Sequence, residues 1–342
     1  MHMADALLSP AVGATLWAAS AGVFAGCSAK VRRERDERKV PLMGVLGAFV
    51  FALQMINFTI PLTGSSGHLG GGLLLAILLG PHAAFLTIAS VLVVQALFFA
   101  DGGLLALGCN LFNLGVIPAF ITYPLVYRPL AGRIPTPRRR TVATVTAAII
   151  ALQLGALAVV LETVASGIAA LPLQPFALVM LPIHLVIGLV EGLATAAVVA
   201  FVVRARPELL ADAPAQPGRS AVPGWTLLTA FLAAALVTGG ILTWFASAHP
   251  DGLDWSVARV AGSTALDEPV HTAHRVLAAI QERLAVLPEY AFRAGAGSDG
   301  ASVQAGADAR LGSSLAGVVG GLLTLALCVL IGIALRQRPG KG

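Results

Sequence analysis

Residues 82–100 read HAAFLTIASVLVVQALFFA, a run of 19 residues without Asp, Glu, Lys or Arg. A membrane-spanning helix needs roughly 20 predominantly apolar residues. A charged side chain at the centre of a bilayer costs about 2.5–3.5 kcal/mol on insertion scales. The stretch therefore predicts a helix that crosses a lipid bilayer.

The same pattern recurs along the chain, which has 342 residues, of which 57% are hydrophobic and only 11% charged. Soluble domains usually carry about 25% charged residues, and the mean hydropathy here is +0.85. The fold class predicted is an all-α polytopic membrane protein, with about seven spans in a first module and two in a second. We expect spans at 10–29, 41–61, 69–80, 82–100, 105–127, 142–166, 177–203, 225–247 and 313–335.

The basic residues set the expected orientation of these spans. If the amino terminus lies outside, the inside loops hold 17 of the 22 lysines and arginines. Cytoplasmic loops carry such an excess, so we expect an outside start and read the net charge of +5 as a topology signal, with no nucleic-acid site. Those loops are 30–40, 128–140, 204–223 and 336–342.

Composition divides the chain at residues 206–223, a segment rich in Pro, Ala and charge, as linkers are. We expect a membrane module at 1–205, a cytoplasmic linker, and a module at 224–342 with an outer loop at 251–310. Within that loop, Val276, Ile280, Leu284 and Leu287 recur at helical spacing and predict an amphipathic helix, and 294–310 is expected to be flexible.

One outer loop of the first module, 61–72, reads PLTGSSGHLGGG. Irregular backbone at membrane depth is tolerated only where protein or a cavity surrounds it. The segment after it, 69–80, is too short to span untilted, and short or broken helices in transporters point to binding sites. We expect this loop to fold inward and line a site with His68.

The chain begins Met-His, and its first basic residue is Lys30, so no secretory leader is indicated and Met1 is expected to remain. Such a start offers one metal ion three nitrogens: the terminal amine, the amide of His2 and its imidazole Nδ1. His68 is the candidate fourth ligand, and square-planar nitrogen sites suit Ni(II) or Cu(II). A solvated terminus and a surface histidine remain the alternative.

Three stretches, MHMADALLSP at 1–10, TGSSGHLGGG at 63–72 and VVQALFFADGGLLALGCNLFNLGV at 93–116, resemble the CbiM/NikM family. These are the substrate-binding membrane (S) components of energy-coupling-factor cobalt and nickel transporters. PDGLD at 250–254 resembles the PDGLE signature of their N component. Met3, Ala4 and Asp254 depart from the usual family residues, but none is an expected ligand.

The resemblance implies a metal site made by Met1, His2 and His68, with Ni2+ or Co2+ as transported substrate and no organic cofactor. It implies high-affinity capture and ATP-driven import across a prokaryotic cell membrane. The expected partners are a transmembrane coupling subunit and two ATPase subunits, because this chain has no phosphate-binding loop motif and is not expected to be an enzyme. The rival hypotheses are a membrane sensor or scaffold that binds a partner through 251–310, and a self-sufficient ion-coupled carrier.

Other polar residues have two possible roles. Asp101 is either an interfacial cap or a group that positions a ligand. The other candidates for supporting the site are Asn57, Ser65, Ser66, Asn110 and Asn113. His184 and Glu191 share a helix face and are expected away from His2, as a structural pair or a subunit contact.

The remaining features are expected to be structural. His82 is expected in an inner turn, and His271 and His274 on a solvated helix face rather than at a metal-capture site. The cysteines are expected to pack as small apolar residues, at Cys27, Cys109 and Cys328. A ladder of small residues repeats every four positions, at Ala14, Ala18, Gly22 and Gly26. Such a ladder allows another helix to approach closely. That helix is either inside the bundle, which we favour, or part of a partner subunit.

Overall fold

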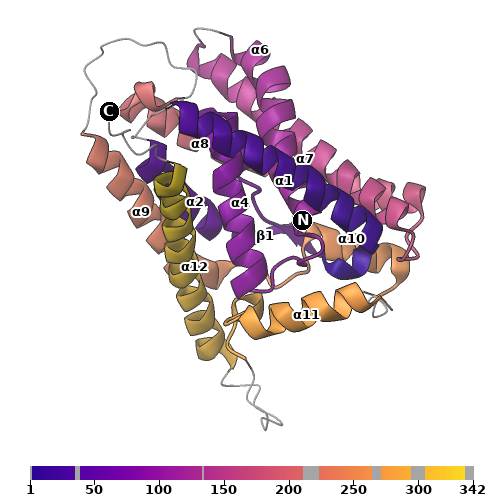
Figure 1. Cartoon of the computed structure of the whole chain (residues 1–342). Helices are drawn as coiled ribbons and strands as arrows, with labels where there is room; N and C mark the ends of the chain where they lie inside the picture. Colours follow the sequence, from indigo (N-terminus) through magenta and orange to yellow (C-terminus); the bar gives the residue numbers. More distant parts are fainter. Residues whose placement is uncertain are drawn as a thin grey trace, which may run out of the picture.

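The computed structural model describes residues 2–34, 39–132, 135–210, 223–263, 271–293 and 305–335. These residues form a helical bundle with one short β-hairpin (Figure 1). The all-α polytopic class is confirmed, because within the described ranges six helices are long and apolar enough to cross a membrane.

The first part of the chain contributes most of the bundle. Its elements are η1 (Asp5–Leu7), α1 (Pro10–Glu34), α2 (Lys39–Gln54), β1 (Phe58–Ile60), β2 (Ser65–Gly67), α3 (Gly72–Leu79), α4 (Pro81–Phe98), α5 (Leu107–Leu111), the π-helix η2 (Phe112–Tyr127), α6 (Arg128–Ala131), α7 (Pro137–Ser166), α8 (Leu173–Ala205) and η3 (Pro207–Leu209). Helical structure lies within each of the seven spans expected here, although only part of the span at 41–61 is helical.

The rest of the chain adds two long helices and a cap of short ones. Its elements are α9 (Gly224–Gly240), η4 (Leu242–Phe245), α10 (Gly252–Ala261), α11 (Thr272–Leu284), η5 (Pro288–Tyr290) and α12 (Ala305–Leu335). Of the stretch expected to be flexible, 294–310, the first part up to residue 304 lies outside the described residues. From Ala305 onward the expectation is wrong, because α12 begins there.

Helices α2, α3 and α4 form the centre of the bundle, and all eight residues of α3 are buried. Helices α9 and α12 pack against α2, while α7 and α8 pair with each other. Figure 1 shows α9 and α12 together on one side of α4, with α7 and α8 on the other. Helix α8 exposes a stripe of leucines to the surroundings, as a lipid-facing helix does: Leu178, Leu185, Leu189 and Leu193.

The span expected at 41–61 is only partly helical, because α2 ends at Gln54 and Phe58–Ile60 form β1. β1 pairs antiparallel with β2, with Phe58 opposite Gly67 and Ile60 opposite Ser65. The hairpin satisfies its own backbone groups within a buried region, which an irregular loop cannot do alone. It also fixes where the following residue, His68, stands.

The small-residue ladder of α1 is exposed, contrary to the internal position that we favoured. Added Cβ atoms at Gly22 and Gly26 would meet no described atom within 4 Å. The helix packs through another face, where the Ser20 hydroxyl donates to the Gly108 carbonyl at 2.8 Å. The ladder residues are therefore free to meet a partner helix.

The structural roles of the cysteines and of His82 match the expectation. All three cysteines are buried and carry free thiols. His82 stands in the first turn of α4, immediately after the turn at Gly80, and its ring packs edge-on against Phe120. Helix α11 is amphipathic, but Val276, Ile280 and Leu284 of its apolar stripe stay exposed.

Candidate metal site

The first residues of the chain are fixed against the loop that follows α4. The Met3 amide donates to Asn110 Oδ1 at 2.8 Å, and the Gly103 amide donates to the Met3 carbonyl at 2.9 Å. The Asp5 carboxylate accepts the Ala106 amide at 2.9 Å. These bonds hold His2 at a defined place, while Met1 lies outside the described residues.

The structure brings His2 and His68 together. Their rings stack in parallel, with centroids 5.0 Å apart and an interplanar angle of 5°. The His2 side chain is 6% exposed and that of His68 is 8% exposed. Two histidines separated by two helices and a hairpin in the chain thus lie against each other in a buried region.

The hydrogen bonds of His68 indicate which nitrogen can bind a metal. Its Nδ1 lies 3.3 Å from the Leu69 carbonyl, an arrangement that places the ring proton on Nδ1. Burial lowers the pKa of His68 to about 3. The ring is therefore neutral at pH 7, and the lone pair lies on Nε2.

His2 is held by a carboxylate, because its Nδ1 lies 3.1 Å from Asp101 Oδ1. Its Nε2 is buried and has no hydrogen-bond partner among the described residues. Nδ1 is the nitrogen that the predicted chelate uses. Metal binding at that atom therefore requires the imidazole to give up its proton and its contact with Asp101.

Asp101 is positioned from both sides. Ala100, with a φ of 53°, turns the backbone out of α4, and the Tyr290 hydroxyl donates to Asp101 Oδ2 at 2.5 Å. Tyr290 itself has a φ of 60°, a strained conformation for a non-glycine residue. Burial alone would raise the pKa of Asp101, but the charge and hydrogen bond of His2 and the Tyr290 hydroxyl outweigh it and lower the pKa.

The PDGLD segment reaches the same place from the other part of the chain. The Ser66 amide donates to the Pro250 carbonyl at 2.8 Å, and a parallel bridge joins Ser66 to Asp251. Asp251 Oδ2 lies 3.9 Å from His68 Nε2, while Oδ1 caps α10 by accepting the Leu253 and Asp254 amides. The segment therefore closes one edge of the hairpin that carries His68.

The backbone after His68 is fixed by a buried carboxylate. Glu191 of α8 accepts the Gly70 amide at 2.8 Å and the Gly71 amide at 3.0 Å, one on each oxygen. Gln54 of α2 donates to the Gly70 carbonyl at 2.7 Å. Two helices thus hold the loop from opposite directions.

The sequence pattern of one family matches more than half of this chain. Its description is "cobalt uptake substrate-specific transmembrane region", and it matches residues 2–209. The chain belongs to the CbiM family. A second pattern, that of the PDGLE domain, matches residues 225–337.

Relatives of this CbiM-family chain are described as metal transport proteins. A fused nickel transport protein of Archaeoglobus fulgidus is 31% identical over 96% of both chains. The fused nickel transport protein NikMN of Rhodobacter capsulatus is 33% identical over 64% of this chain and 67% of its own. A crystal structure described as a truncated transition metal transporter is 31% identical, covers 59% of this chain and 98% of its own, and has a TM-score of 0.50.

The other supporting residues expected in the CbiM-family part serve different contacts. Asn57 accepts the Ser247 amide through its carbonyl at 2.7 Å, and the Ser66 hydroxyl donates to the His249 carbonyl at 2.8 Å. Ser65 bonds to Thr63 within the hairpin. Asn110 holds Met3, whereas Asn113 donates to Glu162 at 2.9 Å, on the far side of Met3.

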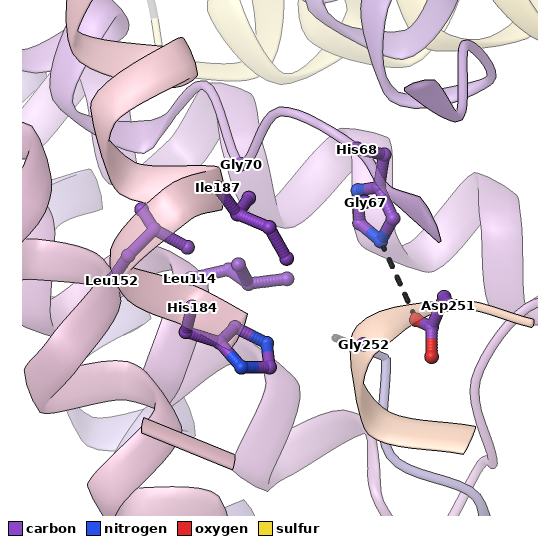
Figure 2. A pocket seen from close by; sticks show the side chains of 9 residues that line it. All are labelled: Gly67, His68, Gly70, Leu114, Leu152, His184, Ile187, Asp251 and Gly252. Atoms are coloured by element: carbon purple, nitrogen blue, oxygen red, sulfur yellow. Dashed lines mark ion pairs between the residues drawn. The ribbon is translucent and has the colours of Figure 1, made fainter. Parts of the chain in front are cut away.

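The expected positions of His184 and Glu191 are wrong. No hydrogen bond or ion pair between the two is found in the described structure. Both instead reach the loop that carries His68. Glu191 accepts the Gly70 and Gly71 amides, and His184 lines a cavity together with His68. Figure 2 shows His184 on one wall of this cavity, with His68 and Asp251 opposite. The expectation failed because the hairpin and PDGLD fold further into the bundle than their place between spans indicates.

His274 is also placed wrongly by the sequence, since it is buried and its Nε2 lies 2.8 Å from the Leu8 carbonyl. His271 is exposed, as expected. Among the residues that the structure describes, no group of three or more His, Cys, Asp and Glu side chains is arranged to hold a metal ion. The predicted chelate is not such a group, because it takes two nitrogens from the backbone.

Sequence reasoning missed two contributors to the site, Asp251 and Tyr290, and did not predict what Glu191 contacts. The signal for Asp251 was present in the PDGLD motif, which was used only to identify the second module. Intramembrane carboxylates are functional candidates by default, and this rule selected Glu191 without its partner. Nothing in the sequence around Tyr290 predicts its contact with Asp101.

Proposed function

We propose that this chain captures Ni2+ or Co2+ at the outer face of a prokaryotic cell membrane, as the substrate-specific subunit of an ATP-driven importer. The stacked, buried pair of His2 and His68 is the observation that carries the proposal. Membership of the CbiM family and the nickel and cobalt transport proteins among the relatives support the same substrate class.

The proposed ligands are the Met1 amine, the amide and Nδ1 of His2, and Nε2 of His68. His68 is neutral and needs no proton removed, whereas the amine and the amide of His2 each give up a proton to bind. Metal affinity therefore falls with decreasing pH. A planar set of four nitrogens suits nickel better than cobalt, which more often takes other geometries.

The organisation proposed follows the composition. Residues 1–205 form the metal-binding module, 206–223 a cytoplasmic linker and 224–342 a PDGLE module, with the amino terminus outside. The contacts of Ser66 and His68 with 249–251 support a role for the second module at the metal site itself. In this reading the PDGLE module closes over the captured ion.

The test is a titration of the purified chain with Ni2+ in lipid nanodiscs. We expect one tight equivalent, and His68→Ala weakens it by at least about a hundredfold, more than the loss of a supporting residue costs. His82→Ala removes a histidine at the amino-terminal end of α4, the end opposite to Asp101, and leaves the Ni2+ affinity unchanged.

Equal affinity in the His68→Ala variant contradicts the proposed site. A chain that binds no Ni2+ tightly at all favours the sensor or scaffold hypothesis. Nickel uptake into vesicles that contain this chain alone, without ATPase partners, contradicts the ATP-driven arrangement.

The energy for import is proposed to come from a transmembrane coupling subunit and two ATPase subunits. The exposed ladder of α1 is the surface proposed for the coupling subunit, since small side chains let helix backbones approach closely. The ladder begins one turn into the helix that follows the metal-binding terminus. The proposed docking surface thus lies on the helix that directly follows the metal-binding terminus.

Leucine at Gly22 and Gly26 is expected to abolish co-purification with the coupling subunit, because the added side chains keep the two helices apart. Nickel binding by the isolated chain stays unchanged, since neither position contacts another described residue. The matched control is Ala197→Leu, which adds similar bulk at an exposed position of α8. Normal co-purification of the double variant places the partner elsewhere.

A further inference from the structure

His184 carries a buried nitrogen without a partner. The residue lies in α8 and is 1% exposed. Its Nδ1 lies 2.8 Å from the Met180 carbonyl, which places the ring proton on Nδ1. Nε2 then has a lone pair, and no hydrogen-bond partner for it is found among the described residues. A buried acceptor left unsatisfied costs about 1–3 kcal/mol.

The His184 side chain lines the cavity next to His68 (Figure 2). The backbone of PDGLD passes directly over the ring, because a Cβ added at Gly252 would lie 3.1 Å from His184 Cε1. Asp251 and His68 stand on the opposite wall, and the rest of the lining consists of three glycines and three apolar side chains, Leu114, Leu152 and Ile187. The His184 ring is therefore close to the carboxylate without being bonded to it in the described structure.

The size of the cavity restricts its occupant. Its volume of about 10 Å³ is close to the least space that holds one water molecule. A bare metal ion fits, whereas a hydrated ion or an organic molecule does not. An imidazole nitrogen and a carboxylate oxygen are both ligands that first-row divalent metals accept, and the carboxylate offsets part of the ion's charge.

We propose that His184 and Asp251 form a second site for the transported divalent ion, immediately inside His68, which the ion occupies after leaving the outer chelate. The inference rests on the proposed function, because it concerns the path of the same ion. Asp251 Oδ2 is 3.9 Å from His68 Nε2, so the carboxylate reaches both sites. The ion exchanges backbone and His2 nitrogens for Asp251 and His184, while the amine and amide that it leaves take protons back from water, with no change in the oxidation state of the ion.

A structural role for His184 uses only Nδ1. Asparagine at this position keeps an N–H that can donate to the Met180 carbonyl, but it lacks the imidazole lone pair that binds a metal. His184→Asn therefore separates the two roles. His82→Asn is the matched control, because it makes the same change at a histidine outside the cavity.

The experiment is equilibrium dialysis of the purified full chain in nanodiscs against increasing Ni2+. The wild type is expected to bind two equivalents, one tight and one weaker. His184→Asn loses the weaker equivalent and keeps the tight one, with a Kd within about twofold. Asp251→Asn weakens the second equivalent by about tenfold or more, since a neutral amide oxygen replaces a carboxylate. His82→Asn binds like the wild type.

Other outcomes show whether the second site or the proposed function is wrong. One tight equivalent that depends on His68, with no second up to millimolar Ni2+, overturns the second site and leaves the outer site standing. A second equivalent that survives His184→Asn in a folded protein, checked by its melting temperature, also overturns it. If no tight equivalent binds at all, the proposed function itself fails.

Discussion

A tag left uncleaved ahead of Met1 is expected to abolish tight nickel binding. The proposed chelate exists only while the Met1 amine is free, because a preceding residue turns that amine into an amide. We expect the Kd for Ni2+ to rise about a thousandfold, or about 4 kcal/mol, in a titration of the purified chain. The same tag after Gly342 has no effect, and cleavage that restores Met1 restores binding.

Insertion of a single glycine after Met1 provides a sharper control. It moves the histidine to third place, where the amine, two amides and the imidazole supply four nitrogens from the terminus alone. In that variant His68→Ala therefore changes the Kd little, whereas in the natural chain it costs at least about a hundredfold. If His68 matters equally in both backgrounds, the terminus is not part of the site.

Replacement of Glu191 by leucine is expected to produce the second large effect. It leaves the buried Gly70 and Gly71 amides without acceptors, at about 1–3 kcal/mol each. The free energy of unfolding falls by about 2–6 kcal/mol. The loop that positions His68 loosens, so the Kd for Ni2+ rises by about a hundredfold. Chemical denaturation and metal titration of the same sample measure the two effects.

Two further variants separate the position of the loop from general stability. Glu191→Gln keeps one acceptor oxygen and turns an N–H₂ toward a backbone N–H, so its losses lie between those of wild type and Glu191→Leu. Gln153→Leu removes the 2.9 Å bond that Gln153 Nε2 donates to the Leu181 carbonyl between α7 and α8. It lowers stability without changing nickel affinity. A normal affinity in Glu191→Leu contradicts the role of the carboxylate.

The sequence predicts the bundle well because lipid imposes a simple rule on composition. Helical structure lies within each of the nine apolar segments expected, including the short 69–80, where α3 occupies Gly72–Leu79. The segment 41–61 is helical only in part, because backbone pairing with β2 replaces the helix at its carboxyl-terminal end. Hydropathy identifies apolar segments but not the conformation of a segment that is buried by protein rather than by lipid.

The candidate site is only half predictable for the same reason. His2 and His68 follow from chelate chemistry and from their common side of the membrane, and the structure brings them together. Three further residues come from other elements: Asp251, Tyr290 and His184. Asp251 and His184 lie near His68 because PDGLD and the hairpin enter the bundle deeply, whereas Tyr290 contacts Asp101. Side-chain periodicity contains no measure of that depth.

The pairing of Ser66 with Pro250 and Asp251 involves very few residues. Between two separate molecules, so short a contact would break readily and the partners would diffuse apart. Because both segments belong to one chain, each re-encounter is intramolecular, and linked partners can reach effective concentrations in the millimolar range. The fusion thus keeps PDGLD available to the hairpin even when so short a contact opens.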